Sequence, residues 1–253
     1  MFNNAIVITP CPAIINGLSS SGLGKPDYKR ALEQHSGYIR ILGQLGLKVK
    51  QLPENELFPD STFIEDVAIC TSSCAVITRP GAVTRRGEIA GIRQMLAEYY
   101  DKIEEITNPG TLEGGDVMMA DNHFFIGISG RTNIAGADQL IKILQKYKFT
   151  GSKIPLEKML HLKSGVSYLE NNKMIVSGEF VDNKSFGSFE RIIIDEDEIY
   201  AANSLWINGT VLVPEGFPKS RKKIEKAGYN TIAVNVSEFR KVDGGLSCLS
   251  LRF

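Results

Sequence analysis

A cysteine near the carboxyl terminus is the strongest candidate nucleophile in this 253-residue chain. Cys248 lies in the stretch Gly244-Gly245-Leu246-Ser247-Cys248, which is expected to lead into a short strand. A free cysteine is often only a small buried hydrophobe. Two adjacent glycines, however, leave room for another group to approach the backbone. The pattern therefore favours a reactive thiol, provided that the rest of the chain anchors this terminal segment.

Acidic residues gather in short clusters that could bind a cation. The segment Glu113-Gly114-Gly115-Asp116 is a poor start for an exposed strand, because neither glycine packs, but it lets a ligand lie against the backbone. Carboxylates that face one pocket repel one another unless a cation joins them. A guanidinium, which is planar and donates several hydrogen bonds, suits them best. The further acids that could join this pocket are Asp60, Glu65 and Asp66.

One of the three histidines is placed to act as a base for the thiol. His161 occupies, in a repeated strand pattern, the position that acids occupy in two other copies. Histidine is a common partner of a nucleophilic thiol. His35 and His123 are interpreted as structural, and Arg85 and Arg131, each after a predicted hairpin, could hold a substrate carboxylate.

The elements that would position these residues recur as strand, strand and helix. The turn Asn208-Gly209 between two apolar runs is a strong hairpin signal. A final copy has only a first strand, Leu246–Leu251, and the strand Ala5–Thr9 and the helix over 28–45 supply what it lacks. The first strands of the other copies are expected at 65–69, 116–119, 166–169 and 205–207.

Five such copies, the last shared between the two ends, predict a closed ring. The fold class is therefore an α/β protein, a five-bladed α/β propeller closed by pairing of the N- and C-terminal segments, with residues 1–253 as a single domain. Closure would anchor the strand of Cys248, and the entrances of the inner strands would face one central pocket. An open α/β sheet with coincidental hairpins is the alternative.

The composition excludes several classes of protein. Twenty-nine basic and 29 acidic side chains balance, which argues against binding to nucleic acid or a membrane surface. The N-terminus has no basic region followed by a long apolar run, so no signal peptide is expected. Four cysteines are too few for a disulfide scaffold, and Cys70 and Cys74 lack the second pair that a metal site would need. A cytoplasmic protein is expected.

Five short motifs follow one another along the chain. They are Phe-Pro-Asp-Ser-Thr-Phe-Ile-Glu-Asp (58–66), Leu-Glu-Gly-Gly-Asp (112–116), Gly-Arg-Thr-Asn (130–133), Leu-His-Leu-Lys-Ser (160–164) and Lys-Val-Asp-Gly-Gly-Leu-Ser-Cys (241–248). Together these motifs resemble those of the dimethylarginine dimethylaminohydrolase family, which has the pentein-like propeller fold. The resemblance spans essentially the whole chain in order and shows no departure at the catalytic positions.

The resemblance implies hydrolysis of Nω-methylated arginine to citrulline and an amine, without metal or cofactor. By this resemblance Cys248 is the nucleophile, His161 the general acid and base, and Glu113 its orienting partner. It also implies a lid over residues 17–24, and it is compatible with a homodimer. The substrate-binding residues that it implies are Leu18, Asp60, Glu65, Asp66, Arg85, Arg131 and Val242.

Other activities remain open on the sequence. An arginine deiminase would share the fold and nucleophile but act on unsubstituted arginine, and the family's deiminases carry an inserted helical region that is absent here. An amidinotransferase would pass the amidine to an amine in place of water. A binding module that has lost catalysis is disfavoured by the intact Cys248, His161 and Glu113.

Overall fold

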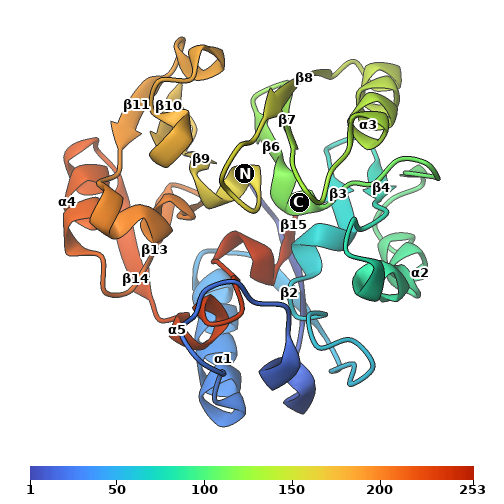
Figure 1. Ribbon diagram of the computed structural model, residues 1–253, viewed down its shortest axis with the longest axis horizontal. Helices are drawn as coiled ribbons and strands as arrows, with labels where there is room; N and C mark the ends of the chain where they lie inside the picture. Colours follow the sequence, from blue (N-terminus) through green and yellow to red (C-terminus); the bar gives the residue numbers. More distant parts are fainter.

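The computed structural model describes all residues, 1–253, and contains five separate three-stranded sheets. In Figure 1 these sheets surround a common centre, and both chain ends project near the middle of the view. The first four sheets are β3(Ala68–Cys70)–β4(Ala75–Ile77)–β5(Ile103–Glu105), β6(Val117–Ala120)–β7(His123–Ile128)–β8(Thr150–Pro155), β9(Val166–Tyr168)–β10(Lys173–Val176)–β11(Glu190–Ile193) and β12(Leu205–Ile207)–β13(Thr210–Pro214)–β14(Asn230–Val234).

The fifth sheet joins the two ends of the chain. Its order is β15(Leu251–Arg252)–β1(Asn4–Ile8)–β2(Lys48–Leu52), with Ala5 opposite Arg252 and Ile6 opposite Leu251 in an antiparallel pair. The predicted closure by the terminal segments is therefore confirmed. Because β15 starts three residues after Cys248, this pairing anchors the segment that carries the candidate nucleophile.

Each sheet has the same internal pattern, an antiparallel pair of strands and a third strand that runs parallel to the central one. A parallel connection needs a crossover, and helices supply most of them. The helices are α1(Tyr28–Gln44), α2(Ile92–Leu96), α3(Ile134–Lys146), α4(Pro218–Lys226) and the short α5(Ser237–Arg240). The hairpins and most helices agree with the sequence-based prediction, whereas none of the five third strands was predicted. These strands expose part of each face, so their apolar pattern is weak.

The central strand of every sheet packs against both neighbouring sheets. Along β1, Ala5 and Val7 enter one apolar cluster while Ile6 and Ile8 enter the next. β4, β7, β10 and β13 alternate between two clusters in the same way. Successive side chains of a strand point to opposite faces, so a strand buried on both faces reads as a continuous apolar run. The five clusters thus form a closed ring of cores.

The inner segments of the structure differ from the sequence-based prediction. The acid-led strand expected over 65–69 begins with a 3-10 turn, Ile64–Val67, and becomes β3 only at Ala68. The expected strand 246–251 is likewise a 3-10 turn, Ser247–Leu249, before β15. A turn brings consecutive residues round a tight bend and can aim side chains at one point, whereas a strand would send alternate residues to opposite faces.

One helix buries a histidine without a partner, which predicts acid sensitivity. His35 lies on the inner face of α1, is 1% exposed, and its Nε2 has no hydrogen-bond partner. Burial lowers the pKa of His35 from 6.5 to about 4. The unfolded chain therefore binds a proton between these values while the folded chain does not, so stability is full above pH 6.5 and falls as the pH drops toward 4, by about 3 kcal/mol in all.

Denaturant unfolding across this pH range checks the expectation for His35. His35→Leu should flatten the pH dependence of the unfolding free energy by about this amount. His123→Gln is the matched control, because both ring nitrogens of His123 already have hydroxyl partners on β8. Equal slopes in the parent and His35→Leu would contradict the assignment.

No helix of this protein is long and apolar enough to cross a bilayer.

Candidate active site

The sulfur of Cys248 sits in the middle of the 3-10 turn Ser247–Leu249. The backbone N–H of Gly245 donates to its Sγ at 3.4 Å. The side chain of Asn203 holds the same turn, because its Oδ1 accepts from the Ser247 N–H at 3.0 Å and its Nδ2 donates to the Ser247 Oγ at 3.0 Å. Arg252 of β15 donates to the Ser247 carbonyl at 2.9 Å. The thiol is therefore fixed from both sides of its turn.

His161 and Glu113 form a buried pair beside this sulfur. The His161 Nε2 lies 2.8 Å from Glu113 Oε2, and the other oxygen, Oε1, accepts from the Ala82 N–H at 3.0 Å. Glu113 is 1% exposed. Two fixed bonds leave the carboxylate little freedom, so it orients the imidazole. The pair arises because the entrances of β6 and β9 adjoin at the ring axis.

The electrostatics of the pair favour a charged histidine. The carboxylates of Asp66, Asp116 and Glu113 outweigh desolvation and raise the pKa of His161 from 6.5 to about 9. Burial raises the pKa of Glu113, but the hydrogen bond and charge of His161, together with the Ala82 N–H and the charge of Arg85, outweigh it and lower this pKa to about 2. Near neutral pH, His161 is thus an imidazolium that can donate a proton.

The thiol has the opposite tendency. Burial, followed by the nearby charges of Glu65 and Asp66, raises the pKa of Cys248 from 9.0 to about 12. The Gly245 N–H and Lys163 oppose this shift without cancelling it. Cys248 is therefore a neutral thiol when the site contains no ligand. A cation bound next to the sulfur would offset the carboxylates and favour the thiolate.

A single cleft of about 190 Å³ joins the catalytic pair to most of the other predicted residues. Nine of the ten candidate residues line it, and only Glu65 does not. The nine are Leu18, Asp60, Asp66, Arg85, Glu113, Arg131, His161, Val242 and Cys248. These nine include three carboxylates, two arginines and the sulfur, which suits a molecule with a cationic end and an anionic group.

Asp66 is held where two entrance segments meet. Its Oδ1 accepts from the Gly115 N–H at 2.8 Å and its Oδ2 pairs with Arg85. A Cβ built on Gly115 would lie 2.8 Å from the His161 ring, so only glycine lets the ring approach so closely. The glycines were expected to make room for a ligand. At Gly115 and at Gly245, where a Cβ would meet Asn203, they make room for the protein's own side chains.

The two arginines of the cleft are not equivalent. Arg85 is 5% exposed, and its Nε and one terminal nitrogen bind Glu88, while the other binds Asp66. A guanidinium has five N–H groups, so little of Arg85 remains for a ligand. The Arg131 side chain is 24% exposed, and its single ion pair, to Glu113, is a long 3.9 Å. Arg131 is therefore the freer partner for a ligand carboxylate.

Glu65 lies behind the nucleophile, outside the cleft. Its Oε1 accepts from Lys163 at 2.6 Å and from Arg252 at 3.0 Å, and its Oε2 accepts from the Ser247 Oγ at 2.7 Å. All of these partners are protein groups. Glu65 therefore lies under the turn of Cys248 and does not line the main cleft, but it lines an adjoining cavity of about 60 Å³ together with Cys248 and His161. Its role in substrate binding stays a prediction.

The segment predicted as a lid is docked over the cleft. Asp60 Oδ1 accepts from the Leu18 N–H at 3.0 Å, and the Ser20 N–H donates to Asp243 Oδ2 at 2.6 Å. The Ser19 Oγ donates to the Lys241 carbonyl at 2.6 Å. These bonds join the segment that follows the 3-10 turn Pro12–Asn16 to Lys241 and Asp243, just before the nucleophile. The lid and the thiol are thus positioned by the same stretch of chain.

Known proteins are similar in sequence to this chain over its full length. A family model described as arginine deiminase matches residues 59–204. The N(G),N(G)-dimethylarginine dimethylaminohydrolase of Pseudomonas aeruginosa is 52% identical over 254 residues and covers 100% of both chains. Its namesake from Streptomyces coelicolor is 33% identical, covering 98% of this chain and 96% of the relative. This chain belongs to the dimethylarginine dimethylaminohydrolase family. The family predicted from the motifs is thus confirmed.

Solved structures agree with this dimethylarginine dimethylaminohydrolase assignment. A mutant of the P. aeruginosa enzyme complexed with citrulline matches with a TM-score of 0.99 at 51% identity, covering 100% of both chains. The N-terminal domain of the cyanobacterial arginine dihydrolase ArgZ matches with a TM-score of 0.89 at 17% identity, covering 98% and 97%. The second match shows a shared fold.

Several residues that organise the site of this family member were not predicted from the sequence. Glu88 neutralises Arg85 three residues along the chain, a spacing that could have suggested an ion pair. Asn203, from the end of the 3-10 segment Glu196–Ala202, had no signal of its own. Asp243 has a φ of 58°, which the neighbouring glycine pair could have indicated as a turn.

Three candidate ligand atoms for a metal also meet in the cleft. One atom each from Asp66, Glu113 and His161 lies within 4.8 Å of the others. Their donor atoms already serve Gly115, Arg85, Ala82 and each other. A metal would therefore compete with these hydrogen bonds and with the charge of Arg85 beside Asp66.

Proposed function

We propose that this protein hydrolyses Nω-methylated arginines, asymmetric dimethylarginine and monomethylarginine, to citrulline and dimethylamine or methylamine. The observation that carries the proposal is the cleft in which Cys248, an imidazolium–carboxylate pair and Asp66 adjoin, with Arg131 also lining its wall. The two relatives named as dimethylarginine dimethylaminohydrolases support it, as does the citrulline complex of the P. aeruginosa enzyme.

Binding is proposed to begin with the two ends of the substrate. Asp66 and Glu113 accept N–H groups of the guanidinium, and Arg131, with the remaining N–H of Arg85, binds the α-carboxylate. Asp60 and the backbone near Leu18 and Val242 bind the α-amino group. The lid contacts described above close this end. Fixed charges at both ends hold the guanidinium carbon in register with the sulfur.

The guanidinium is proposed to activate the nucleophile that attacks it. Its positive charge offsets Glu65 and Asp66 and lowers the pKa of Cys248, so that the thiol releases its proton to solvent water while His161 stays protonated. The thiolate then forms an S–C bond to the guanidinium carbon, which yields a tetrahedral adduct. The methylated nitrogen leaves when His161 transfers its proton to it and the C–N bond breaks.

A thiouronium remains on Cys248, and hydrolysis must remove it. His161, now neutral, takes a proton from water, and the resulting hydroxide adds to the thiouronium carbon. Collapse breaks the S–C bond, the hydroxyl proton passes to the departing thiolate, and citrulline and the Cys248 thiol are released. Proton transfer of this kind accelerates a reaction by roughly 10²–10⁴. The Glu113 carboxylate is useful in both steps because it stabilises the charged histidine without blocking its return to neutrality.

The proposal includes the larger setting of the site. Five sheets in a closed ring are interpreted as a five-bladed propeller that forms one domain over residues 1–253. A small-molecule substrate in a cytoplasmic compartment is proposed, which the four free cysteines support.

Parallel measurement of citrulline release from arginine, monomethylarginine and asymmetric dimethylarginine tests the proposal, with Cys248→Ser as the blank. We expect both methylated substrates to turn over with kcat/KM at least about tenfold above arginine, since a methyl group missing from a fitted site costs about this much. Higher kcat/KM for arginine would establish a deiminase. Folded protein that turns over none of the three would refute hydrolysis.

A further inference from the structure

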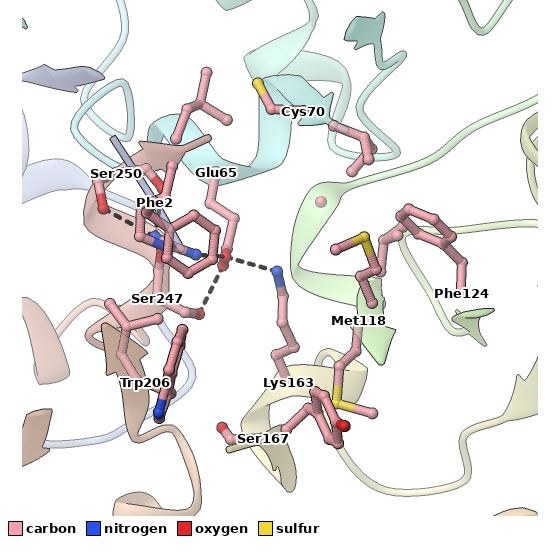
Figure 2. Close-up of a pocket in the computed structure, with 18 of the residues that line it drawn as sticks. Phe2, Glu65, Cys70, Met118, Phe124, Lys163, Ser167, Trp206, Ser247 and Ser250 are labelled. Atoms are coloured by element: carbon pink, nitrogen blue, oxygen red, sulfur yellow. Dashed lines mark hydrogen bonds and ion pairs between the residues drawn. The ribbon is translucent and has the colours of Figure 1, made fainter. Parts of the chain in front are cut away.

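A second pocket lies on the ring axis behind the nucleophile. It has a volume of about 170 Å³, and the inner strand of every sheet, β3, β6, β9, β12 and β15, contributes to its wall. Figure 2 shows it between Phe2 and Trp206 on one side and Met118 and Phe124 on the other. At about 30 Å³ per water, it has room for roughly six waters or one small organic molecule.

Charged groups with a net positive balance form one end of this pocket. Lys163 and Arg252 both pair with Glu65, at 2.6 Å and 3.0 Å, so two cations share one carboxylate. The side chains of Lys163 and Arg252 are 16% and 11% exposed. The Lys163 Nζ has no protein partner other than Glu65, although an ammonium donates three hydrogen bonds. In Figure 2 the Lys163 side chain crosses the pocket to reach Glu65.

The remaining wall is apolar apart from a few hydroxyls and one acid. Trp206 and Phe2 pack with ring centroids 6.2 Å apart, and Met118 and Leu205 are buried. The acid is Glu170, which is partly buried. Its charge would repel a second negative group in the pocket, so the wall favours one anionic head and a short uncharged tail.

We propose that this axial pocket binds a small monocarboxylate, with its carboxylate on Lys163 and Arg252 and its alkyl chain against Trp206 and Met118. The ligand class follows from the unpaired positive charge, the free donors of Lys163 and the apolar wall. The site is distinct from the catalytic cleft, because none of its lining residues belongs to that cleft.

The axial pocket is linked to the catalytic centre by a third, smaller cavity that shares lining residues with both. Glu65, Lys163 and Ser247 also line a small cavity of about 60 Å³ that contacts His161 and Cys248. A carboxylate on Lys163 would cancel a charge that helps the Cys248 thiolate to form. Binding is therefore expected to slow the hydrolysis; this consequence, unlike the binding itself, rests on the proposed function.

The single tryptophan of the chain makes binding directly measurable, since Trp206 lines the pocket. Butyrate is titrated into Cys248→Ser protein whose catalytic cleft is filled with monomethylarginine, and Trp206 fluorescence is followed. Butyramide, which has the same shape without charge, and succinate, which has a second charge, are the ligand controls. We expect saturable binding of butyrate, with butyramide and succinate about tenfold to a hundredfold weaker, as for loss of a charged hydrogen bond.

Matched variants locate the binding. Lys163→Met should weaken butyrate by a similar factor, while Arg131→Gln in the catalytic cleft and Lys153→Met on β8 should leave it unchanged. Thermal unfolding first verifies that each variant is folded. Equal affinity for butyrate and butyramide, no saturable signal, or sensitivity to Arg131→Gln would each overturn the proposal. The ligand ranking in otherwise unaltered protein decides the case even if Lys163→Met fails to fold.

Discussion

Glu113→Gln is expected to lower kcat for methylarginine hydrolysis by about 10³ while the protein stays folded. The glutamine has the same shape and can still accept one hydrogen bond. It cannot stabilise an imidazolium, and Glu113 is one of the carboxylates that raise the pKa of His161 to about 9. The variant histidine should lose its proton at a lower pH, so the leaving amine would lack an acid near neutrality. The loss should therefore be smallest at low pH and grow as the pH rises.

The pH profile of kcat measures this effect separately from folding. In the parent enzyme the alkaline limb should lie near pH 9, and in Glu113→Gln it should move toward lower pH. Glu104→Gln is the matched control, because Glu104 is a partly exposed acid of β5 that pairs with Lys146 and Tyr147 away from the cleft. A variant with reduced kcat but an unmoved alkaline limb would show that Glu113 only shapes the site.

The ring could be predicted from the sequence because its hairpins depend on local signals. Asn208-Gly209 forms the expected tight turn between β12 and β13, with Asn208 at a φ of 47°. Closure by the termini followed from counting incomplete copies. The third strands could not be found in this way, because a half-exposed edge strand such as β2 carries lysines and glutamine and has little apolar pattern.

The candidate residues were easier to find than their partners. Residue type and position brought Cys248, His161 and Glu113 together correctly as neighbours in one cleft. Glu65 and Asp66 are adjacent in the chain, and the sequence treated them alike. The 3-10 turn that contains them directs Asp66 to Arg85 in the cleft and Glu65 to Lys163 behind the nucleophile. Which side a residue of a short turn faces depends on long-range pairs that no local pattern contains.

Neutral and cationic alkylating reagents are expected to distinguish Cys248 from an ordinary thiol. Its pKa of about 12, against 9.0 for a typical cysteine, makes its thiolate about a thousandfold rarer in the free enzyme. Iodoacetamide should therefore react about 10³-fold more slowly with Cys248 than with a small free thiol. Its rate should rise about tenfold per pH unit, with no plateau near neutral pH, because the thiolate fraction increases in this way below the pKa.

A cationic amidine, chloroacetamidine, should recover most of this loss. Its charge would lie between Asp66 and the sulfur, as the guanidinium is proposed to do, and lower the thiol pKa on binding. Mass spectrometry assigns the modified cysteine, with Cys248→Ser as the blank and glutathione as the reference thiol. Asp66→Asn should abolish the preference for the cationic reagent. If iodoacetamide instead reacts with Cys248 as fast as with glutathione, the pKa of Cys248 is that of an ordinary thiol, and the proposed lowering of this pKa by the bound cation loses its basis.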